Sequence, residues 1–464
     1  MKLYFIIPPR VTKANEDAIN RGLLASPGYT PFPPLNLAYL ISVAKKLGHE
    51  CQVLDLNVKS WPGPEEILRF GPDLLLLSSM TLQYREARVV IKNMAGRLPI
   101  VIGGAHASIF REKLLEDGID IVAVGEGENT LAALLANFPN NLESVPGIIF
   151  KNDGKVCDSG KCKQVLSLDS LPFPSWEYFD LALYDNTYYD RKCLPVITSR
   201  GCPYQCAYCF KGVFGDTVRL RSAKNIFEEI VFLKDRFGVG AVQFQDDTFT
   251  MSRCRVEEFC NLLIENKTDI LWRCLARVDQ VDFKLIDLMR KAGLKSIAFG
   301  IESGSQEVLD KLGKKIKLQQ VSEAIEACKR VGVVSKGYYI IGLPWDTPKT
   351  LKKTFEFAKN NRTTQLQFTL PVAYPGTKLW EIGKERGLPV EDYVESFSWD
   401  ETTPPYSFSK YLSIKQIKAA IIKARNIVKP NTAVRVWRVA KNKDLRDYPT
   451  MIRKVLGSSG RAFL

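Results

Sequence analysis

Histidine is scarce in this chain, which contains only His49 and His106. A metal site built from several histidines is therefore excluded, and a metal ion would have to be held by cysteine or carboxylate. The sequence also lacks any run of about 18 apolar residues, so no transmembrane helix is expected. The first residues form too short an apolar run for a signal peptide and lack a small-residue cleavage site. We therefore expect a cytoplasmic protein.

Positive charge is concentrated near the end of the chain. The net charge is +14, and residues 411–464 contribute +11 of it, with 13 Lys or Arg against 2 Asp. A uniformly basic nucleic-acid-binding protein is thus disfavoured, and no nucleic-acid partner is expected. The 464 residues are 45% hydrophobic and 25% charged, as in ordinary globular proteins. At about 100–200 residues per domain, this length predicts two to four domains.

Eleven cysteines are spread along the chain, an odd number that argues against a disulfide scaffold and for a reducing compartment. Cys202, Cys206 and Cys209 stand together, spaced Cys-x3-Cys-x2-Cys in a loop after a strand-like run. Three thiolates can hold three irons of a [4Fe–4S] cluster and leave the fourth iron open. A structural zinc site would need a fourth Cys or His nearby, and none is close in the sequence.

Short apolar runs alternate with amphipathic helical stretches from residue 194 to about 370. The runs after 194–198 lie at residues 240–245, 270–275, 295–300, 335–341 and 365–371. This alternation predicts a parallel sheet, in which ligands bind at the carboxyl ends of the strands. Polar residues and a glycine follow the strands at those ends, and they are Asp246, Asp247, Arg277, Glu302, Ser303 and Gly342.

The first third of the chain has a similar alternation. Five strands are predicted at residues 2–7, 51–56, 73–78, 99–102 and 120–124, with helical patterns between them. This order predicts an open α/β sheet of the doubly wound type. Glycine-rich turns at Gly103-Gly104 and at Gly125 and Gly127 follow strands, where bare backbone could lie against a ligand. Neither turn has the spacing G-x-G-x-x-G, so a dinucleotide site is disfavoured.

These motifs resemble those of a known family. The cysteine loop, with Tyr208 before its last cysteine, resembles the cluster loop of the radical SAM superfamily. The segments Pro33–Leu40, Leu77–Thr81, Gly103–Ser108 and Gly125–Glu128 look like the cobalamin-binding domain that precedes the barrel in cobalamin-dependent radical SAM enzymes. The resemblance spans about residues 1–385 and includes segments similar to the interdomain linker and the barrel-closing loop, at Leu171–Glu177 and Tyr374–Lys378.

The resemblance implies an α/β architecture in four parts. We expect a Rossmann-like cobalamin-binding domain at residues 1–150 and a connector at 151–193. A radical SAM partial (β/α)6 barrel at 194–385 and a basic helical C-terminal region at 386–464 would follow. The implied cofactors are a [4Fe–4S] cluster on the three cysteines, S-adenosyl-L-methionine (SAM) and cobalamin.

Seven residues are expected around SAM. They are Tyr208, Asp246, Asp247, Arg277, Glu302, Ser303 and Gly342. Asp246 or Asp247 would accept hydrogen bonds from the methionine ammonium, and the other Asp would be the N-cap of the next helix. Arg277 would pair with the methionine carboxylate.

The other four would contact the remaining parts of SAM. Tyr208 would lie against the adenine, and Gly342 would let backbone approach it closely. Glu302 would accept from the ribose hydroxyls, and Ser303 would donate to a carboxylate.

Nine residues at strand ends are expected to contact cobalamin. They are Ser78, Ser79, Gly103, Gly104, Ala105, His106, Gly125, Glu126 and Gly127. The D-x-H-x-x-G motif of the classical B12 mutases is absent, so no histidine of that motif lies below cobalt. His106 is expected at the corrin edge or nucleotide tail, with a locally satisfied loop histidine as the alternative. The residue below cobalt is expected within residues 79–84, and the sequence does not indicate which of them it is. The alternative for the whole domain is a Rossmann unit that binds no cofactor.

The resemblance implies a methyltransferase that acts on an unactivated carbon of a small molecule. One SAM would methylate cobalamin, and a second would supply a 5′-deoxyadenosyl radical, with electrons from a reductant protein such as flavodoxin or ferredoxin. No catalytic side chain beyond the cofactor ligands is expected. Cyclisation or rearrangement without methyl transfer is one alternative. A methylthiotransferase is disfavoured because only Cys51 precedes residue 150.

The basic C-terminal region has a helical pattern. Apolar residues recur on one stripe at Ile414, Ile417, Ile421, Ala424 and Val428, with Lys415, Lys418, Arg425 and Lys429 mostly on the other side. One interpretation is a cap packed on the barrel. Another is peripheral contact with an anionic membrane, which would suit a lipid-soluble substrate. A basic cradle for an anionic soluble substrate would leave a similar pattern.

Overall fold

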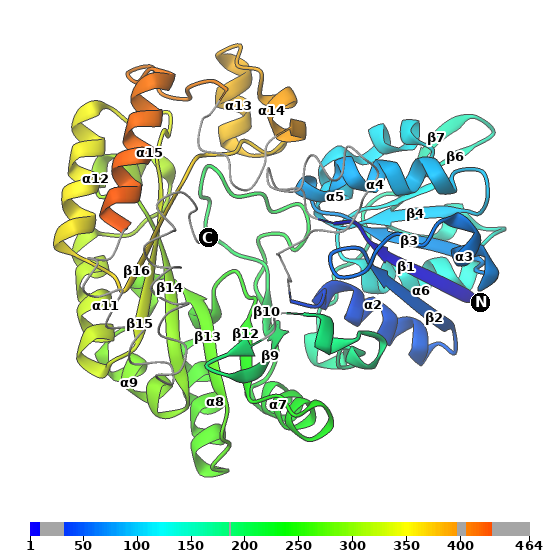
Figure 1. Ribbon diagram of the computed structural model, residues 1–464, viewed down its shortest axis with the longest axis horizontal. Helices are drawn as coiled ribbons and strands as arrows, with labels where there is room; N and C mark the ends of the chain where they lie inside the picture. Colours follow the sequence, from blue (N-terminus) through cyan, green and yellow to red (C-terminus); the bar gives the residue numbers. More distant parts are fainter. Residues whose placement is uncertain (10–31, 185–186, 397–404, 429–464) are drawn as a thin grey trace, which may run out of the picture.

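The computed structural model describes residues 1–9, 32–184, 187–396 and 405–428, and it places two α/β units side by side (Figure 1). The N-terminal sheet has the strand order β2-β1-β3-β4-β5-β6-β7. Its strands are β1 (Lys2–Ile7), β2 (Glu50–Asp55), β3 (Leu74–Ser78), β4 (Ile100–Gly103), β5 (Ile121–Ala123), β6 (Ile148–Asn152) and β7 (Lys155–Asp158). The first five are parallel and the last two antiparallel, so the predicted doubly wound sheet is confirmed.

Helices cover both faces of this sheet. They are α2 (Leu35–Lys46), α3 (Pro64–Arg69), α4 (Thr81–Met94), α5 (Ala105–Phe110) and α6 (Gly127–Asn137). Helices α2 and α6 pack on the face that contains Phe5, whereas α3, α4 and α5 pack on the face that contains Ile6. Strands buried from both sides read as continuous apolar runs, which is why β3 has the sequence Leu-Leu-Leu-Leu-Ser.

The sheet continues beyond the predicted boundary at residue 150. Strands β6 and β7 form a hairpin whose turn contains Asp153 and Gly154, both with positive φ. Most of β7 is exposed, so its sequence has no alternation of apolar and polar residues that would have predicted a strand.

The second sheet has the order β16-β15-β14-β13-β12-β9-β8. Its strands are β8 (Thr187–Tyr188), β9 (Arg191–Val196), β12 (Ala241–Phe244), β13 (Leu271–Ala276), β14 (Leu294–Glu302), β15 (Val334–Ile340) and β16 (Gln365–Thr369). From β9 to β16 the strands are parallel and adjacent in sequence order, and β8 pairs antiparallel with β9. The predicted partial barrel is thus confirmed in its described strands.

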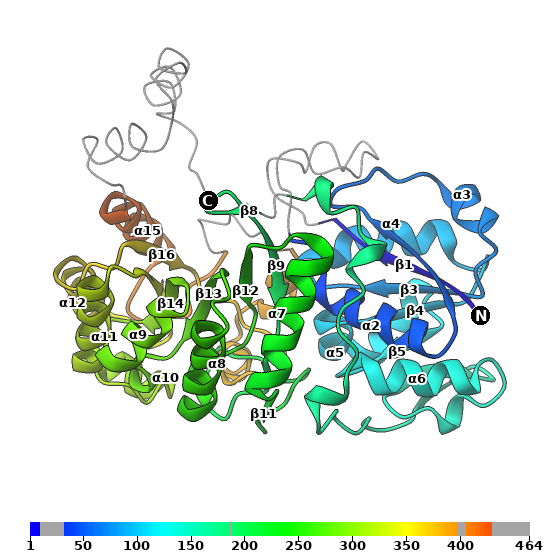
Figure 2. The same cartoon turned by 90° about the horizontal axis from the view of Figure 1, so that it is seen from below.

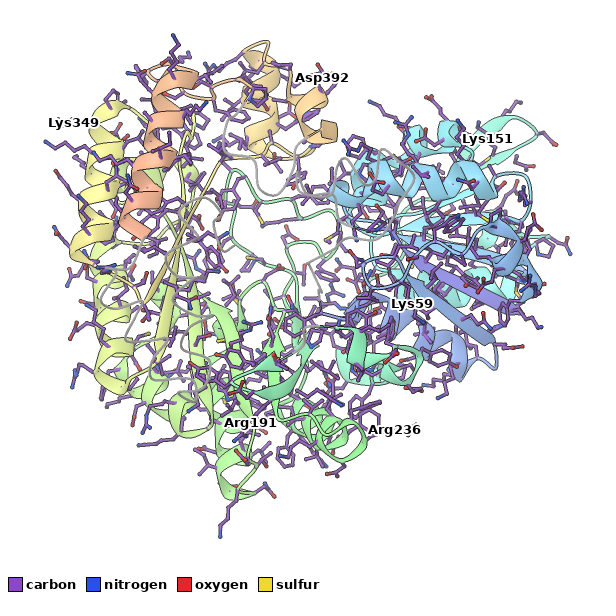
Figure 3. All side chains as sticks on the ribbon, viewed as in Figure 1. Lys59, Lys151, Arg191, Arg236, Lys349 and Asp392 are labelled. Atoms are coloured by element: carbon purple, nitrogen blue, oxygen red, sulfur yellow. The ribbon has the colours of Figure 1, made fainter. Side chains whose placement is uncertain are left out.

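The barrel sheet has a buried outer face and a half-exposed inner face. The outer helices are α7 (Ala223–Phe237), α8 (Arg253–Glu265), α9 (Phe283–Lys291), α10 (Gln306–Leu312), α11 (Leu318–Val331) and α12 (Pro348–Asn360). Trp272, Phe299 and Tyr339 are fully buried beneath them. Figures 1 and 2 show these helices on the outside of the strands, and in Figure 3 the charged side chains of Arg236 and Lys349 point outward from α7 and α12.

Three helices follow the barrel, namely α13 (Lys378–Glu385), α14 (Val390–Ser396) and α15 (Ile414–Val428). Helix α15 confirms the predicted helix, and it packs on β16 and α12. Ile417, Ile421 and Ala424 are buried there, while Lys415 and Lys418 are exposed. The side chains of Arg425 and Val428, and residues 429–464 including Lys429, lie outside the described residues. In the described part of the chain, no helix is long and apolar enough to span a membrane.

Candidate functional site

The three clustered cysteines lie in a loop tied at its base by two short strands, β10 (Ser199–Arg200) and β11 (Arg219–Leu220). Cys202 and Cys206 are half-buried, Cys209 is exposed, and none is in a disulfide. The Cys209 amide donates to the Cys206 carbonyl at 3.0 Å. Gly201 has φ +85°, and a Cβ there would lie 2.2 Å from the Thr217 carbonyl oxygen. Only glycine therefore suits the start of this loop.

The donor set of the loop suits an iron–sulfur cluster. Among the described residues, no group of three or more His, Cys, Asp or Glu is arranged to hold a metal ion. Cluster thiolates each bind a different iron, and three free thiols on one loop provide that type of ligand. Although much of Cys209 is exposed, desolvation of its thiol and the nearby Asp247 carboxylate raise the pKa to about 11, so iron binding would have to displace its proton. The assignment of these three ligands stays a prediction.

Tyr208 and Glu302 are brought together at the carboxyl end of β14. The Tyr208 hydroxyl donates to Glu302 Oε1 at 2.7 Å, and Lys314 Nζ donates to the same oxygen at 2.9 Å. A Cβ at Gly300 would lie 2.4 Å from Glu302 Oε1, so glycine makes room for this cluster. Glu302 itself has φ +67°, an uncommon conformation outside glycine that often marks functional sites. Sequence reasoning missed Lys314, which follows a helix-ending glycine and belongs to no motif.

Arg277 lies beside the cysteine loop. Its guanidinium is 3.4 Å from the centroid of the Tyr204 ring. Arg277 Nε and Nη2 donate to the Asp279 carboxylate at 3.0 and 2.9 Å, and Nη2 also donates to the Lys314 carbonyl at 2.9 Å. Burial alone lowers the pKa of Arg277, but hydrogen bonding to Asp279 raises it overall, so the side chain stays cationic. Arg277 and Lys314 therefore place two cationic groups at this end of the barrel, each paired with a carboxylate.

The two adjacent aspartates have different environments. Asp246 is buried and accepts hydrogen bonds from the Thr198 amide and hydroxyl and from the Ser199 amide at 3.0 Å. Asp247 is exposed, and its carboxylate has no hydrogen-bond partner among the described residues. Neither aspartate caps a helix, because Thr248 precedes the next short helix and Ser252 precedes α8. The N-cap alternative is therefore wrong, and Asp247 has the more accessible carboxylate.

Ser303 and Gly342 already have structural partners. The Ser303 hydroxyl is buried, lies 3.1 Å from the Thr354 hydroxyl and accepts from the Ser305 amide at 3.2 Å. Gly342 has φ +94°, and a Cβ there would lie 3.3 Å from Ile417 Cδ1 of α15. Direct contact of either residue with SAM stays a prediction that the described contacts do not favour.

The residues expected to contact cobalamin gather at the carboxyl ends of β3, β4 and β5, next to the topological switch point between β1 and β3. Gly103 pairs with Ser78 across the sheet, and the Ser78 hydroxyl accepts from Asn36 Nδ2 at 2.5 Å. A Cβ at Gly103 would meet no atom closer than 3.8 Å. Gly104, in contrast, has φ +98°, and its Cβ would lie 2.8 Å from the Ser79 carbonyl oxygen. Bare backbone at this edge suits a flat ligand, and Gly104 is also required by the fold.

His106 is buried on α5 directly after Ala105. Its ring lies 3.9 Å from the Tyr84 ring and 4.3 Å from the Phe110 ring. Burial lowers the pKa of His106 to about 3, so the imidazole is neutral near pH 7. Nδ1 has no hydrogen-bond partner among the described residues. The locally satisfied alternative is therefore not what the structure shows, while contact with cobalamin stays a prediction.

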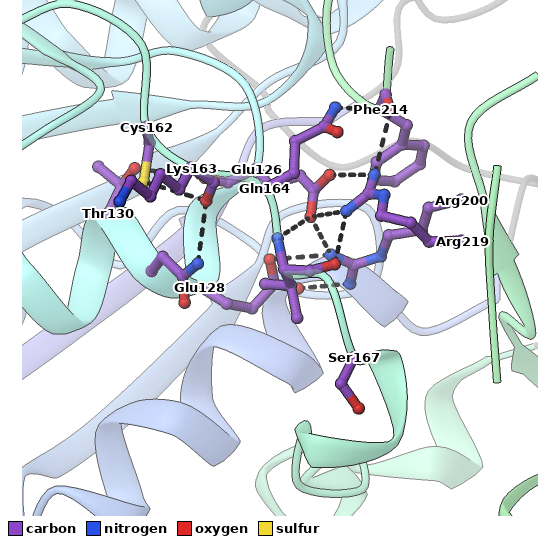
Figure 4. Close-up of polar contacts among 12 residues, drawn as sticks. Glu126, Glu128, Thr130, Cys162, Lys163, Gln164, Ser167, Arg200, Phe214 and Arg219 are labelled. Atoms are coloured by element: carbon purple, nitrogen blue, oxygen red, sulfur yellow. Dashed lines mark hydrogen bonds and ion pairs between the residues drawn. The ribbon is translucent and has the colours of Figure 1, made fainter. Parts of the chain in front are cut away.

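Two buried arginines join the cysteine loop to the β5–α6 loop (Figure 4). We call Glu126, Glu128, Arg200 and Arg219 the interdomain clamp; their side chains are only 3–8% exposed. Arg200 Nη1 donates to Glu126 at 2.9 Å and to Glu128 at 3.1 Å, and Arg219 Nη1 donates to Glu126 at 2.9 Å.

The interdomain clamp gives the β5–α6 loop a second role. The Glu126 carboxylate accepts hydrogen bonds from Arg200 and Arg219, so cobalamin would contact the backbone of this loop rather than the Glu126 side chain. A Cβ at Gly127 would lie 2.9 Å from Leu40 Cδ2, so this glycine is needed for packing on α2. A Cβ at Gly125 would lie 3.9 Å from the Val213 carbonyl oxygen, so this part of the cysteine loop lies next to the β5–α6 loop. Sequence reasoning missed Arg200 and Arg219, because ion pairs between distant segments leave no local pattern.

Comparisons with known proteins agree with this arrangement. Residues 196–358 match the radical SAM superfamily, and residues 21–135 match the B12 binding domain. The uncharacterized methyltransferase PH0819 of Pyrococcus horikoshii is 30% identical over 440 residues, which cover 91% of each chain. The anaerobic magnesium-protoporphyrin IX monomethyl ester cyclase of Rubrivivax gelatinosus is 27% identical, over 80% of this chain and 68% of its own.

The solved structures support the fold. The radical S-adenosylmethionine methyltransferase TsrM from Kitasatospora setae superposes with a TM-score of 0.67 at 17% identity, over 83% of this chain and 76% of its own.

Proposed function

Because the chain belongs to the B12-binding radical SAM enzyme family, we propose that it is a methyltransferase that acts on an unactivated carbon. The cofactors of this family are a [4Fe–4S] cluster, SAM and cobalamin. The observation that carries the proposal is that a loop of three free cysteines lies next to the β5–α6 loop of the N-terminal sheet and is joined to it by buried ion pairs. A relative over nine-tenths of the chain that is named a methyltransferase also supports it.

The chain's own residues would bind and orient the cofactors. When bound, the cluster and SAM supply radical chemistry and cobalamin supplies the methyl donor. Cys202, Cys206 and Cys209 would hold the cluster. Asp247 would accept hydrogen bonds from the methionine ammonium. Asp246 would act through Thr198 and Ser199, by fixing the strand end from which the loop departs.

Positive charge at the end of the barrel would receive the methionine carboxylate. Arg277 and Lys314 are both buried there, and in the described part of the chain each forms a salt bridge with one carboxylate. Tyr208 and Glu302 would contact the adenosine part, where the Glu302 oxygens can accept from ribose hydroxyls. Ser303 and Gly342 would stabilise this region without touching SAM, Ser303 through its contact with Thr354 and Gly342 through its packing against α15.

Cobalamin would lie on backbone rather than on charged side chains. Gly103 and Gly125 present bare backbone at the ends of β4 and β5, where a Cβ would make only ordinary contacts at 3.8 and 3.9 Å, and His106 is buried on α5 next to that edge. No carboxylate or cysteine of this edge is needed for the reaction. The electrons would come from a small reductant protein such as flavodoxin or ferredoxin.

Cyclisation without methyl transfer is the second candidate, favoured by the cyclase of Rubrivivax gelatinosus, which is similar over 80% of this chain. A methylthiotransferase is not favoured: Cys51 is the only cysteine among residues 1–150, and it is buried in the core.

The proposal is tested by anaerobic reconstitution of the full chain with iron, sulfide and hydroxocobalamin. We expect about four irons per chain and one corrinoid, and SAM cleavage upon reduction. The variant C202A/C206A/C209A should lose the iron and SAM cleavage but keep the corrinoid, because the cobalamin edge belongs to the other sheet. A triple variant that keeps its iron, or a wild type that binds no corrinoid, would contradict the assignment. Product formed without the mass of an added methyl group would favour cyclisation.

A further inference from the structure

The inner face of the barrel sheet carries two cationic side chains that the cofactor sites do not use. Arg273 lies on β13 and Lys336 on β15, and both are half-exposed. Their sequence neighbours, such as Trp272 and Gly337, are buried on the face that the helices cover. Because side chains alternate along a strand, Arg273 and Lys336 lie on the opposite face, inside the barrel.

The strand register places these two side chains near each other. Arg273 pairs with Ser296 on β14, and Ser296 pairs with Val334 on β15, two residues before Lys336. Two strand spacings therefore separate them laterally, about 10 Å. Side chains as long as arginine and lysine can reach a common ligand across that distance.

Neither cation has an acidic partner among the described residues. No salt bridge there involves Arg273 or Lys336, and the half-exposed inner positions of β12 to β16 contain no Asp or Glu. The Arg273 guanidinium lies beside the rings of Tyr188 at 4.9 Å and Phe32 at 5.5 Å, and its buried Nε has no hydrogen-bond partner within the described ranges. Lys336 Nζ lies 4.8 Å from the Tyr338 ring centroid.

The wall between these cations and the cofactor end of the barrel is neutral. Leu275, Ala298 and Gly300 occupy the inner positions above Arg273 on β13 and β14. Arg277 lies four positions after Arg273, at the strand end, which corresponds to about 13 Å along the strand. An anion held by the two cations would thus leave a neutral stretch of ligand directed toward the cofactor end.

We propose that the inner face of the barrel binds an anionic substrate through Arg273 and Lys336. The carbon that reacts would lie on the order of 10 Å from a carboxylate or phosphoryl group, along the neutral wall. A guanidinium matches either group through paired hydrogen bonds, and an ammonium adds a point charge. This inference rests on the proposed function in one respect: the bound anion is taken to be the substrate whose carbon is methylated.

The test measures binding without turnover, by isothermal titration calorimetry on the full reconstituted protein. Three probes of similar length are compared, namely phenylhexanoate, phenylhexyl phosphate and the neutral phenylhexanol. We expect at least one anion to bind about tenfold or more tightly than the alcohol. The variant R273Q/K336M should lose that preference, and the tighter anion identifies the head group as carboxylate or phosphoryl.

A matched control lies outside the barrel. Arg330 on α11 is exposed and lies 4.1 Å from the Phe283 ring centroid, so R330Q removes a similar cation–ring contact from the outer surface. This variant should keep the preference for the anion.

Two results would overturn the proposal. One is equal affinity of the wild type for all three probes, and the other is an anion preference that survives in R273Q/K336M. If the double variant does not fold, K336M alone is compared with K336R, and only K336M should weaken anion binding. Binding is measured without methyl transfer, so an anion preference would support this site even if the protein proved not to be a methyltransferase. Absence of the preference would likewise leave the proposed methyltransferase activity untouched.

Discussion

Asp346 shows how one buried carboxyl group at the end of β15 can make stability depend on pH. Its Oδ2 accepts from the amides of Gly342 and Leu343, both at 3.0 Å, and it is only 1% exposed. Burial raises the pKa of Asp346 to about 6, although the amide hydrogen bonds oppose this shift. The folded protein therefore binds this proton more tightly than the unfolded chain does.

The variant D346N is expected to remove that pH dependence. Between pH about 4 and 6 the folded state holds more protons at this group, so its contribution to the free energy of unfolding falls as pH rises. The loss amounts to roughly 2–3 kcal/mol. Urea unfolding of wild type and D346N at several pH values between 4 and 7 would measure it. The substitution D235N, at an exposed position of α7, controls for the loss of one negative charge. Parallel curves for wild type and D346N would contradict this prediction.

Residue types at the site could be predicted from the sequence, but their partners could not. Cysteine spacing pointed to one loop, and polar residues at strand ends pointed to one edge of the barrel. The choice between Asp246 and Asp247 depended on which of them Thr198 contacts, and Thr198 lies 48 positions away in the sequence. Lys314 was missed for the same reason, since its ion pair with Glu302 depends on two segments meeting in space.

At the scale of elements, periodicity predicted the buried strands and the long helices. The buried strands of both sheets, such as β3, are apolar runs bounded by turns, and α11 and α12 each bury one apolar face. Strands that are short or exposed left no such pattern. Strand β7 is mostly exposed, and β10 and β11 contain two residues each.

Helix α15 offers a test of how strongly the C-terminal region is attached to the barrel. Ile417 is 1% exposed and packs against Gly342 and the cluster formed with Leu351 and Phe355, whereas Ile422 on the same helix is 53% exposed. The variant I417A should lower the free energy of unfolding by about 2–4 kcal/mol, because it leaves a cavity. The matched variant I422A should change it by less than about 0.5 kcal/mol. Thermal and urea unfolding measure both, and equal effects would mean that α15 is not held against the barrel.

At the scale of the whole molecule, the two sheets share one hydrophobic core. One cluster of buried residues contains Phe5 and Leu37 of the N-terminal unit together with Leu194 and Trp272 of the barrel. The connector adds polar contacts, such as that of the Tyr184 hydroxyl with Asp55 at 2.9 Å. Sequence reasoning separated the two domains but could not predict how they dock, since docking is encoded in pairs of residues far apart in the chain.

The interdomain clamp is expected to hold the cysteine loop against the β5–α6 loop. Replacing Arg219 by Met leaves Glu126 buried with Arg200 as its one cationic partner among the described residues, and we expect a loss of about 3–5 kcal/mol in the free energy of unfolding. The contact between Lys45 and Glu177 joins α2 to the connector at 2.7 Å but is partly exposed. The matched variant E177Q should therefore lose less than about 1 kcal/mol.

The double variant R219M/E126Q separates an effect of charge from one of packing. If the buried charge is the cause, this variant should be less destabilised than the sum of the two single variants, because neither unpaired charge remains. Urea unfolding gives the free energies, and corrinoid and iron contents after reconstitution report whether the two edges still face each other. R219M that unfolds at the same urea concentration as E177Q would show that the clamp does not stabilise the interface. If R219M loses either cofactor while the double variant retains both, the unpaired charge of Glu126 is what disturbs the two cofactor regions. The balance of buried charge in the interdomain clamp would then determine how these regions are positioned relative to each other.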